Sequence, residues 1–421
     1  MRNIISSLEA HVALCRVSLG ALFLALVPVV HASQSPLIRT IAVAGDPLQV
    51  LVDQTTGFVL VPGGTIMDRY GNFDGPPTLT ILDGKAGRVV KVFPPRNGID
   101  VEPVSAVDGS ARVYINTANV VENTNGAVQQ LTSDGTLHLA GFSLPPLANG
   151  PVSVHVPVAV DRQRSRFVAF GLNFESVDGY DLHTGRQVYS LPIPLTNGAD
   201  AAFVVDRQSG SLFVLSNASL QVLDEVTGHV RASVPISGPA CCLALAATLH
   251  RLVTFVQGQI QVWDTRALQL IGSTLLPPSY PPEELAPFAP AAVHPLAIDA
   301  IAGHAIVLSP GVQVDSGTAQ LIDLHSGTVV RTVTVGGYPY AVAVDPPLHR
   351  AFIANRDTND VAVIDTRTGA VLARVRAGNL PESVAVDERS QTVFVVNSYS
   401  ATATTSGTVT MFDARITGTH E

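Results

Sequence analysis

The chain is short of cysteine, tryptophan, lysine and charge. Of its 421 residues, three are Cys, one is Trp and 14% are charged, and Lys occurs only at positions 85 and 91. The chain has 25 Lys and Arg residues and 34 Asp and Glu residues, which gives a net charge of −9 at pH 7. An acidic chain is a poor partner for nucleic acid and for anionic membrane surfaces. Because aromatic residues make up only 6% of the chain, stacking platforms for single-stranded nucleic acid are not expected.

No apolar run is long enough to span a bilayer. The segment closest to a span is the fourteen-residue stretch 17–30, "VSLGALFLALVPVV", whereas a membrane helix needs about 20 apolar residues. Arg2 and Arg16 precede this stretch and small residues around Ala32 follow it, which is typical of a secretory signal peptide. We expect residues 1–32 to be the signal peptide and 33–421 to form a secreted or periplasmic protein without a membrane span. An uncleaved anchor is the alternative.

The mature chain keeps only Cys241 and Cys242, which are adjacent. Neighbouring cysteines cannot link distant segments, so the fold depends on packing rather than on disulfides. They can form a strained vicinal disulfide, an intermolecular bridge or two thiols. Neighbours on a strand point to opposite faces, which favours two buried thiols.

Local catalytic motifs are absent from the sequence. It has no Cys-x-x-Cys-His, His-Glu-x-x-His or Gly-x-Ser-x-Gly, and neither a phosphate loop nor a Gly-x-Gly-x-x-Gly. No cofactor is therefore evident. A catalytic set assembled from distant segments would leave no such local trace.

The chain instead repeats one turn. An apolar run ends in Asp, and a Gly follows within a few residues before the next run, at Asp83, Asp181, Asp224, Asp323 and Asp365, with looser copies at Asp264 and Asp413. The Asp carboxylate can accept hydrogen bonds from the next backbone N–H groups, and Gly adopts the positive φ that reverses the chain. Each copy therefore predicts the corner of an antiparallel hairpin.

A second marker gives an independent count of the repeats. Apolar runs ending in Asp before a polar turn occur at Asp53, Asp108, Asp161, Asp206, Asp299, Asp345 and Asp387, and Ala247 takes the Asp position in a related copy. Two hairpins in each of eight units, with a period of roughly 40 to 50 residues, predict an all-β fold, a β-propeller of four-stranded antiparallel blades. We favour eight blades, with seven as the alternative count. The strand around 38–43 is expected to complete the last blade and close the ring.

The last two units resemble the YVTN β-propeller repeat, whose characteristic strand ends in Asn. The matching residues are Phe352, Ile353, Ala354 and Asn355 in one unit and Phe394, Val395, Val396 and Asn397 in the next. The resemblance is close over 328–413 and looser from residue 37. It implies a propeller that is often seven-bladed, extracytoplasmic in many bacterial members, and largely without an assigned reaction.

Aligning the units on the Asp that ends each inner strand brings polar residues together five or six positions upstream. The aligned residues are Glu102, His155, Asp200, Cys242, His294, Tyr340 and Glu382. We expect them at the mouth of the central channel, where propellers usually bind ligands. Two imidazoles, of His155 and His294, and three carboxylates suit a divalent metal or acid–base chemistry. The alternative is a rim that is polar because water covers it.

A separate stretch offers oxygen ligands of the kind that calcium prefers. Asp68, Asn72 and Asp74 lie in "MDRYGNFDG", but the full spacing of a calcium loop is missing. An ordinary Asx-rich loop is the alternative.

Together these patterns predict a binding or scaffold module. We expect a monomer that contacts a protein or a small molecule through one propeller face. The alternative is a propeller enzyme, a lactonase-like hydrolase or a dehydrogenase-type subunit, with its site at the channel mouth.

Overall fold

A computed structural model describes most of the chain after residue 37. The described residues are 38–47, 49–64, 66–67, 73–74, 78–93, 112–115, 127–131, 137–143, 158–170, 176–193, 201–216, 218–236, 238, 240–276, 296–311, 315–398 and 407–420. For 46, 64, 66–67, 73–74, 112–115, 127–131, 137–143, 158 and 241, only the backbone is described. All of them belong to one unit, Pro36–Glu421.

The described residues form an all-β fold in which each repeat makes its own sheet, numbered here in chain order. Sheet 1 contains β2 (Asp46–Pro47), β3 (Leu51–Val52), β4 (Phe58–Gly64), β7 (Thr78–Asp83) and β8 (Arg88–Phe93). Sheet 2 has three strands, β9 (Arg112–Ile115), β10 (Ala127–Leu131) and β11 (Leu137–Ser143). Sheet 3 contains β12 (Val158–Asp161), β13 (Arg166–Phe170), β14 (Ser176–Asp181) and β15 (Gln187–Pro192). Sheet 4 contains β16 (Ala202–Asp206), β17 (Ser211–Leu215), β18 (Ser219–Asp224) and β19 (Val230–Pro235).

The C-terminal half repeats this order. Sheet 5 contains β20 (Ala240–Ala246), β21 (Arg251–Val256), β22 (Gln259–Asp264) and β23 (Gln269–Leu275). Sheet 6 contains β24 (Leu296–Asp299), β25 (His304–Ser309), β26 (Gly317–Asp323) and β27 (Val329–Gly336). Sheet 7 contains β28 (Pro339–Asp345), β29 (Arg350–Asn355), β30 (Asp360–Asp365), β31 (Val371–Arg376) and β35 (Gly418–His420). Sheet 8 contains β32 (Pro381–Asp387), β33 (Thr392–Asn397), β34 (Thr408–Asp413) and β1 (Arg39–Ala42).

Two short elements stand apart from these sheets. The strands β5 (Ile66–Met67) and β6 (Phe73–Asp74) pair with each other, and the one helix among the described residues is the 3₁₀ turn Ala247–Leu249. Seven sheets with four or five strands, plus the three-stranded sheet 2, fit the predicted count of eight blades.

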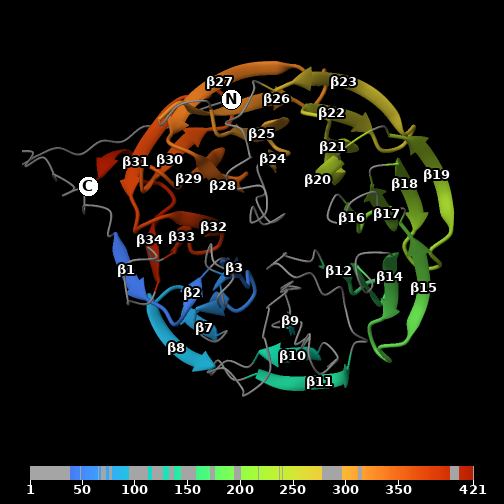
Figure 1. Ribbon diagram of the computed structural model, residues 1–421, viewed down its shortest axis with the longest axis horizontal. Coiled ribbons are helices and arrows are strands. Elements are labelled where there is room, and N and C mark those ends of the chain that lie inside the picture. Colours follow the sequence, from blue (N-terminus) through green and yellow to red (C-terminus); the bar gives the residue numbers. More distant parts are fainter. Residues whose placement is uncertain are drawn as a thin grey trace, which may run out of the picture. The chain divides into compact units, whose positions relative to one another are not determined.

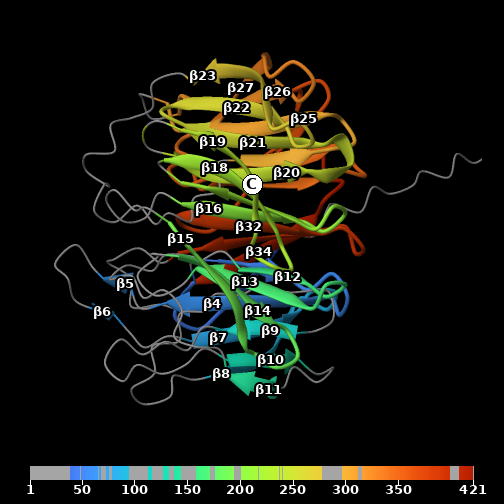
Figure 2. The same cartoon turned by 90° about the vertical axis from the view of Figure 1, so that its right-hand side faces the viewer.

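The sheets follow one another around a common centre, as Figure 1 shows. The first strand of each sheet lies innermost, and the inner strands β16, β20, β24, β28 and β32 contact one another in succession. Figure 2 shows the same sheets from the side, with the strands running across the view. This is the architecture of a β-propeller.

The repeated outer turns form as the sequence predicts. In the turn after β30, Asp365 Oδ1 accepts hydrogen bonds from the backbone N–H groups of Arg367 and Thr368, both at 2.9 Å. Gly369 follows with φ +76°, and its N–H donates to the Asp365 carbonyl at 2.8 Å. The same pattern recurs at Asp83, Asp181, Asp224 and Asp323. The Asp and Gly at these positions therefore supply the geometry of each hairpin.

The Asp that ends each inner strand is buried and bonded to its own turn. Asp53 is 0% exposed and accepts a hydrogen bond from the Thr55 N–H at 2.8 Å, while Asp387 accepts one from Arg389 at 3.0 Å. Asp161, Asp206, Asp299 and Asp345 are bonded in the same way. Both sequence markers are therefore confirmed in the described repeats.

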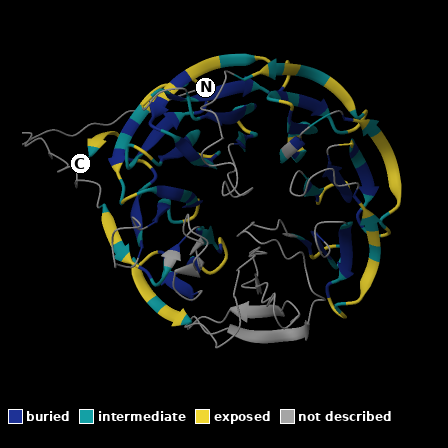
Figure 3. Ribbon diagram, in the orientation of Figure 1, coloured by how far each residue is buried: buried dark blue, intermediate teal, exposed yellow. Residues whose placement is uncertain are grey.

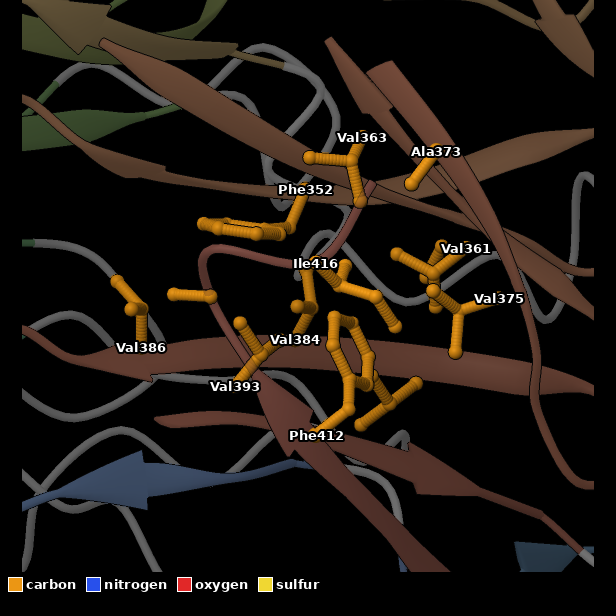
Figure 4. Packing of buried hydrophobic residues seen from close by; sticks show 13 residues of the cluster. Phe352, Val361, Val363, Ala373, Val375, Val384, Val386, Val393, Phe412 and Ile416 are labelled. Atoms are coloured by element: carbon orange, nitrogen blue, oxygen red, sulfur yellow. The ribbon is translucent and has the colours of Figure 1, made fainter. Parts of the chain in front are cut away.

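The hydrophobic core lies between neighbouring sheets. In the sheets whose side chains are described, the second and third strands are buried and the outer strands are largely exposed, as Figure 3 shows. Between sheets 7 and 8, the rings of Phe352 and Phe412 pack with their centroids 6.2 Å apart. Val363, Val393 and Ile416 belong to the same cluster (Figure 4). Because each sheet is covered on both faces, its middle strands can be apolar on both sides.

The N-terminal strand completes the last sheet, as expected. β1 pairs antiparallel with β34, and Arg39 lies opposite Met411. Sheet 8 also meets sheet 1, since the Gln54 side chain donates to the Val386 carbonyl at 2.7 Å and Arg389 donates to the Gln54 carbonyl at 2.9 Å. The first and last repeats are thus joined by hydrogen bonds.

A fifth strand on sheet 7 is not predicted by the repeat. After β34 the chain crosses back, and β35 pairs in parallel with the outer strand β31, with Ala373 opposite Gly418. Arg350 Nη1 donates to the carbonyls of Ala414 and Ile416 at 2.7 and 2.8 Å and fixes this crossing.

Candidate functional site

Three of the seven predicted mouth residues lie in the described part of the chain. These are Cys242, Tyr340 and Glu382. Glu102, His155, Asp200 and His294, together with Asp68 and Asn72, lie outside the described residues, and Asp74 is described only as backbone in β6. Whether all seven converge on one mouth therefore remains a prediction.

The three described residues occupy equivalent positions. Each is the extra residue of a β-bulge near the start of an inner strand, because the register shifts at Cys241/Leu243, at Pro339/Ala341 and at Pro381/Ser383. A bulge re-aims the side chain of its extra residue. We call the end of the sheets where the inner strands begin the start face, and the end where they finish in Asp the aspartate face.

Tyr340 and Glu382 are brought together by Arg356. Arg356 Nη2 lies 3.2 Å from Glu382 Oε1, and the Arg356 guanidinium carbon lies 5.4 Å from the centroid of the Tyr340 ring. The Tyr338 ring stacks on Tyr340, with centroids 6.1 Å apart and planes inclined at 27°. We call Tyr338, Tyr340, Arg356 and Glu382 the tyrosine cluster.

The local backbone explains how the tyrosine cluster forms. Asn355, the last residue of the resembling strand, donates from Nδ2 to the Val335 carbonyl and to Asp360 Oδ1, both at 2.8 Å. The N–H of the next residue, Arg356, donates to the Tyr338 carbonyl at 2.9 Å. The Asn thus ties the end of β29 to the preceding sheet and places Arg356 beside the two tyrosines.

Burial and charge set the electrostatics of the tyrosine cluster. Tyr340 is 7% exposed, and burial followed by the Glu382 carboxylate raises the pKa of its hydroxyl above the usual value, although Arg356 lowers it. Burial also raises the pKa of Tyr338. Both hydroxyls therefore stay protonated at neutral pH, and among the described residues neither donates a hydrogen bond. The buried Nε–H of Arg356 likewise has no acceptor among the described residues.

Sequence reasoning missed Tyr338 and Arg356. The aligned positions lie five and six residues before each inner Asp, whereas Tyr338 lies seven residues before Asp345 and Arg356 lies in the next loop. A signal was present, because Arg356 follows the repeat's Asn directly, where the next unit has Ser398.

Cys242 does not join the tyrosine cluster. Its thiol is reduced and half-buried on sheet 5, two sheets away from Tyr340. In the described ranges, no three His, Cys, Asp or Glu side chains are grouped so that they could hold a metal ion. The described part of the start face therefore presents aromatic rings and charges rather than a metal centre.

The aspartate face has a different chemistry. Asp299 Oδ2 accepts from Thr366 Oγ1 at 2.5 Å and lies 3.2 Å from His349 Nδ1, so one buried carboxylate links sheets 6 and 7. His304 Nδ1 also lies 2.7 Å from the Thr366 carbonyl. These polar groups mostly satisfy one another and join the sheets.

The comparisons with known proteins support the fold. The sequence matches no protein-family model and no curated protein. Among solved structures the chain is similar to BamB from Moraxella catarrhalis, with 13% identity, a TM-score of 0.56 and coverage of 89% of this chain and 98% of that one. It is also similar to Sqt1 from Saccharomyces cerevisiae, with 11% identity, a TM-score of 0.59 and coverage of 90% and 97%.

A third similar structure is an enzyme, the quinohemoprotein alcohol dehydrogenase from Comamonas testosteroni. Its identity is 12%, its TM-score is 0.61, and the match covers 89% of this chain and 76% of that one. The identities are so low that these likenesses define the fold alone. The class of protein is the β-propeller. Within the described residues, no helix has the length and apolar character needed to cross a membrane.

Proposed function

We propose that this chain is an extracytoplasmic, YVTN-like propeller that acts as a binding or scaffold module through its start face. The repeat "YPYAVAVDPPLHRAFIAN" and its successor support the YVTN assignment. The predicted signal peptide at 1–32 supports export. The absence of a local catalytic motif from the sequence favours binding over catalysis.

The contrast between the two faces carries the proposal. On the aspartate face, each described inner Asp is buried and accepts hydrogen bonds from its own turn. On the start face, two stacked tyrosines lie beside an Arg–Glu pair, and their hydroxyls have no partner among the described residues. Aromatic and Arg side chains are enriched where proteins bind partners. An open pair of stacked rings with free hydroxyl donors suits a ligand better than buried Asp carboxylates that bond to their own turns.

Site-specific photo-cross-linking in the producing cells tests this proposal. p-Benzoylphenylalanine is placed at position 338 on the start face or, as the matched control, at position 388, next to the inner Asp387 on the aspartate face. We expect a defined cross-linked adduct from position 338 and none from position 388. Adducts from position 388 alone, or from neither position, would contradict a binding role for the start face.

A further inference from the structure

We infer that the tyrosine cluster receives a basic side chain, the guanidinium or ammonium group of an Arg or Lys on a partner protein. This inference rests on the proposed function, because it names the chemistry of the partner at the same face. It follows from the arrangement of the rings, from the charges around them and from the cation that the chain itself places there.

The two rings form an aromatic surface that is partly open. Tyr340 is buried and Tyr338, stacked upon it, is only half-buried, so part of the Tyr338 ring is exposed to solvent. Tyr338 has φ +49°, which is unusual for a large side chain. Leu380 has the same φ at the matching position before β32. This backbone conformation therefore belongs to the repeat, and in sheet 7 the residue that adopts it is aromatic.

The chain shows which charge this surface accepts. The guanidinium of Arg356 lies 5.4 Å from the Tyr340 ring and is neutralised by Glu382. A cation over the face of a tyrosine is attracted by the negative potential of the ring. One face of the stack thus already holds a guanidinium paired with a carboxylate, and a partner's basic group would repeat this arrangement at Tyr338.

Two carboxylates without an ion pair among the described residues lie beside Gly337, the residue before Tyr338. A Cβ on Gly337 would lie 3.1 Å from Asp315 Oδ1 and 3.1 Å from the Asp357 Cβ, so both residues border the residue before Tyr338. Both are exposed, and within the described chain neither forms an ion pair. The nearby cation Arg374 is already paired with Asp360 at 3.2 Å. With Arg356 paired to Glu382 and Arg374 to Asp360, the carboxylates of Asp315 and Asp357 are the free charges that these contacts place next to Gly337 and Tyr338.

A peptide probe with a matched neutral analogue tests the inference. Fluorescein-labelled Gly-Arg-Gly-Arg-Gly and the same peptide with citrulline at both Arg positions are titrated against the mature full chain, and binding is followed by anisotropy. Citrulline keeps the planar shape but lacks the charge. We expect the Arg peptide to bind at least about ten-fold more tightly, because the cation–π attraction and the charge pairing are both lost in the analogue.

Variants separate the tyrosine cluster from general acidity. Tyr338→Leu, which copies the residue of the next repeat, should weaken binding of the Arg peptide by about ten-fold, and Asp357→Asn should weaken it several-fold. Glu388→Gln, which removes one negative charge from the aspartate face, should leave the affinity unchanged. Circular dichroism of each variant verifies folding, and Asp357→Asn keeps the test decisive should Tyr338→Leu fail to fold.

Equal binding of the two peptides, or equal binding by wild type and Tyr338→Leu, would overturn the inference. These results are independent of the cross-linking. An adduct from position 338 combined with equal peptide affinities leaves the start face as a binding surface and removes the basic partner. Selective binding of the Arg peptide without a cross-linked adduct from position 338 supports the cation site and contradicts the proposed binding role of the start face in the cell.

Discussion

Glu225 is the most strongly perturbed acid in the described chain. It follows the turn Asp224, is 0% exposed, and neither of its carboxylate oxygens accepts a hydrogen bond from a described residue. Burial, followed by the nearby Asp161 carboxylate, raises the pKa of Glu225 to about 8. Burial alone would raise the pKa of Asp161 too, but its hydrogen bonds and ion pair with Arg164, at 2.8 Å, lower it below the usual value. Glu225 is therefore protonated, and Asp161 charged, at neutral pH.

Replacing Glu225 by Gln should flatten the pH dependence of stability. The pKa of Glu225 in the folded chain, about 8, exceeds its ordinary value of 4.5, so the free energy of unfolding falls as the pH rises from about 4.5 through 8. The loss in the wild type is on the order of a few kcal/mol, since each pKa unit corresponds to about 1.4 kcal/mol. Urea unfolding of both proteins at pH 5 and pH 9 measures this difference in the free energy of unfolding. The same pH dependence in Glu225→Gln would show that Glu225 is charged in the folded protein.

Among the elements, the residue after a turn Asp meets the preceding sheet at three of the described interfaces. Glu225 on sheet 4 reaches Asp161 on sheet 3, and Thr366 on sheet 7 donates to Asp299 on sheet 6 at 2.5 Å. The equivalent residue on sheet 6, Leu324, accepts from Arg251 Nε of sheet 5 through its carbonyl at 2.9 Å. One turn position thus joins sheets 3 and 4, 5 and 6, and 6 and 7 by three different kinds of polar contact.

Thr366→Val should destabilise the protein while keeping its shape. The substitution removes the hydroxyl donor to the buried Asp299, and a buried acceptor that loses a partner costs about 1–3 kcal/mol. The midpoint of thermal unfolding reports the change. Thr368→Val is the control in the same turn, because the Thr368 hydroxyl bonds only within its own exposed turn, to the Asp365 carboxylate and to the Ala370 N–H, the latter at 3.3 Å. Equal effects of the two substitutions would contradict a role for the Thr366–Asp299 bond.

At the scale of the whole molecule, β1 connects the beginning of the chain to its last sheet. It covers the edge of β34, and the Val43 N–H donates to the Gly407 carbonyl at 3.0 Å just beyond it. Arg39 Nη1 also donates to the Ala86 carbonyl of sheet 1 at 3.0 Å. β1 therefore contacts both the first and the last repeat.

A chain that begins at residue 44 should be less stable than one that begins at residue 33. Without β1, the edge of β34 is open to pairing with other molecules. We expect the midpoint of thermal unfolding to fall by about 10 °C or more, and light scattering to detect association. Removal of residues 418–421, which deletes the short outer strand β35, is the matched control and should lower the midpoint of thermal unfolding by less. Unchanged stability and a monomeric state after the loss of β1 would show that its pairing is dispensable.

The features that depend on neighbouring residues could be predicted from the sequence. Asp365 and Gly369 form their turn through hydrogen bonds within five residues, so the repeated turn could be predicted from the sequence. The segment "LIRTIAVAGDP" at 37–47 is similar to "VVRTVTVGGYP" at 329–339, and this similarity predicted the strand that completes sheet 8. Aligning the units also placed Cys242, Tyr340 and Glu382 at equivalent positions, and the structure shows that each of them is the extra residue of a bulge.

Only the tertiary structure decided which side chains meet between repeats. Asp299 and Thr366 are 67 residues apart, and the two partners of Arg356 come from different sheets. β35 pairs in parallel with β31, which no local pattern indicates. The physical reason is that turn and strand preferences act over a few residues, whereas contacts between sheets depend on how consecutive sheets pack. The tyrosine cluster, and the raised pKa of the buried Glu225, therefore arise from the packing of whole repeats.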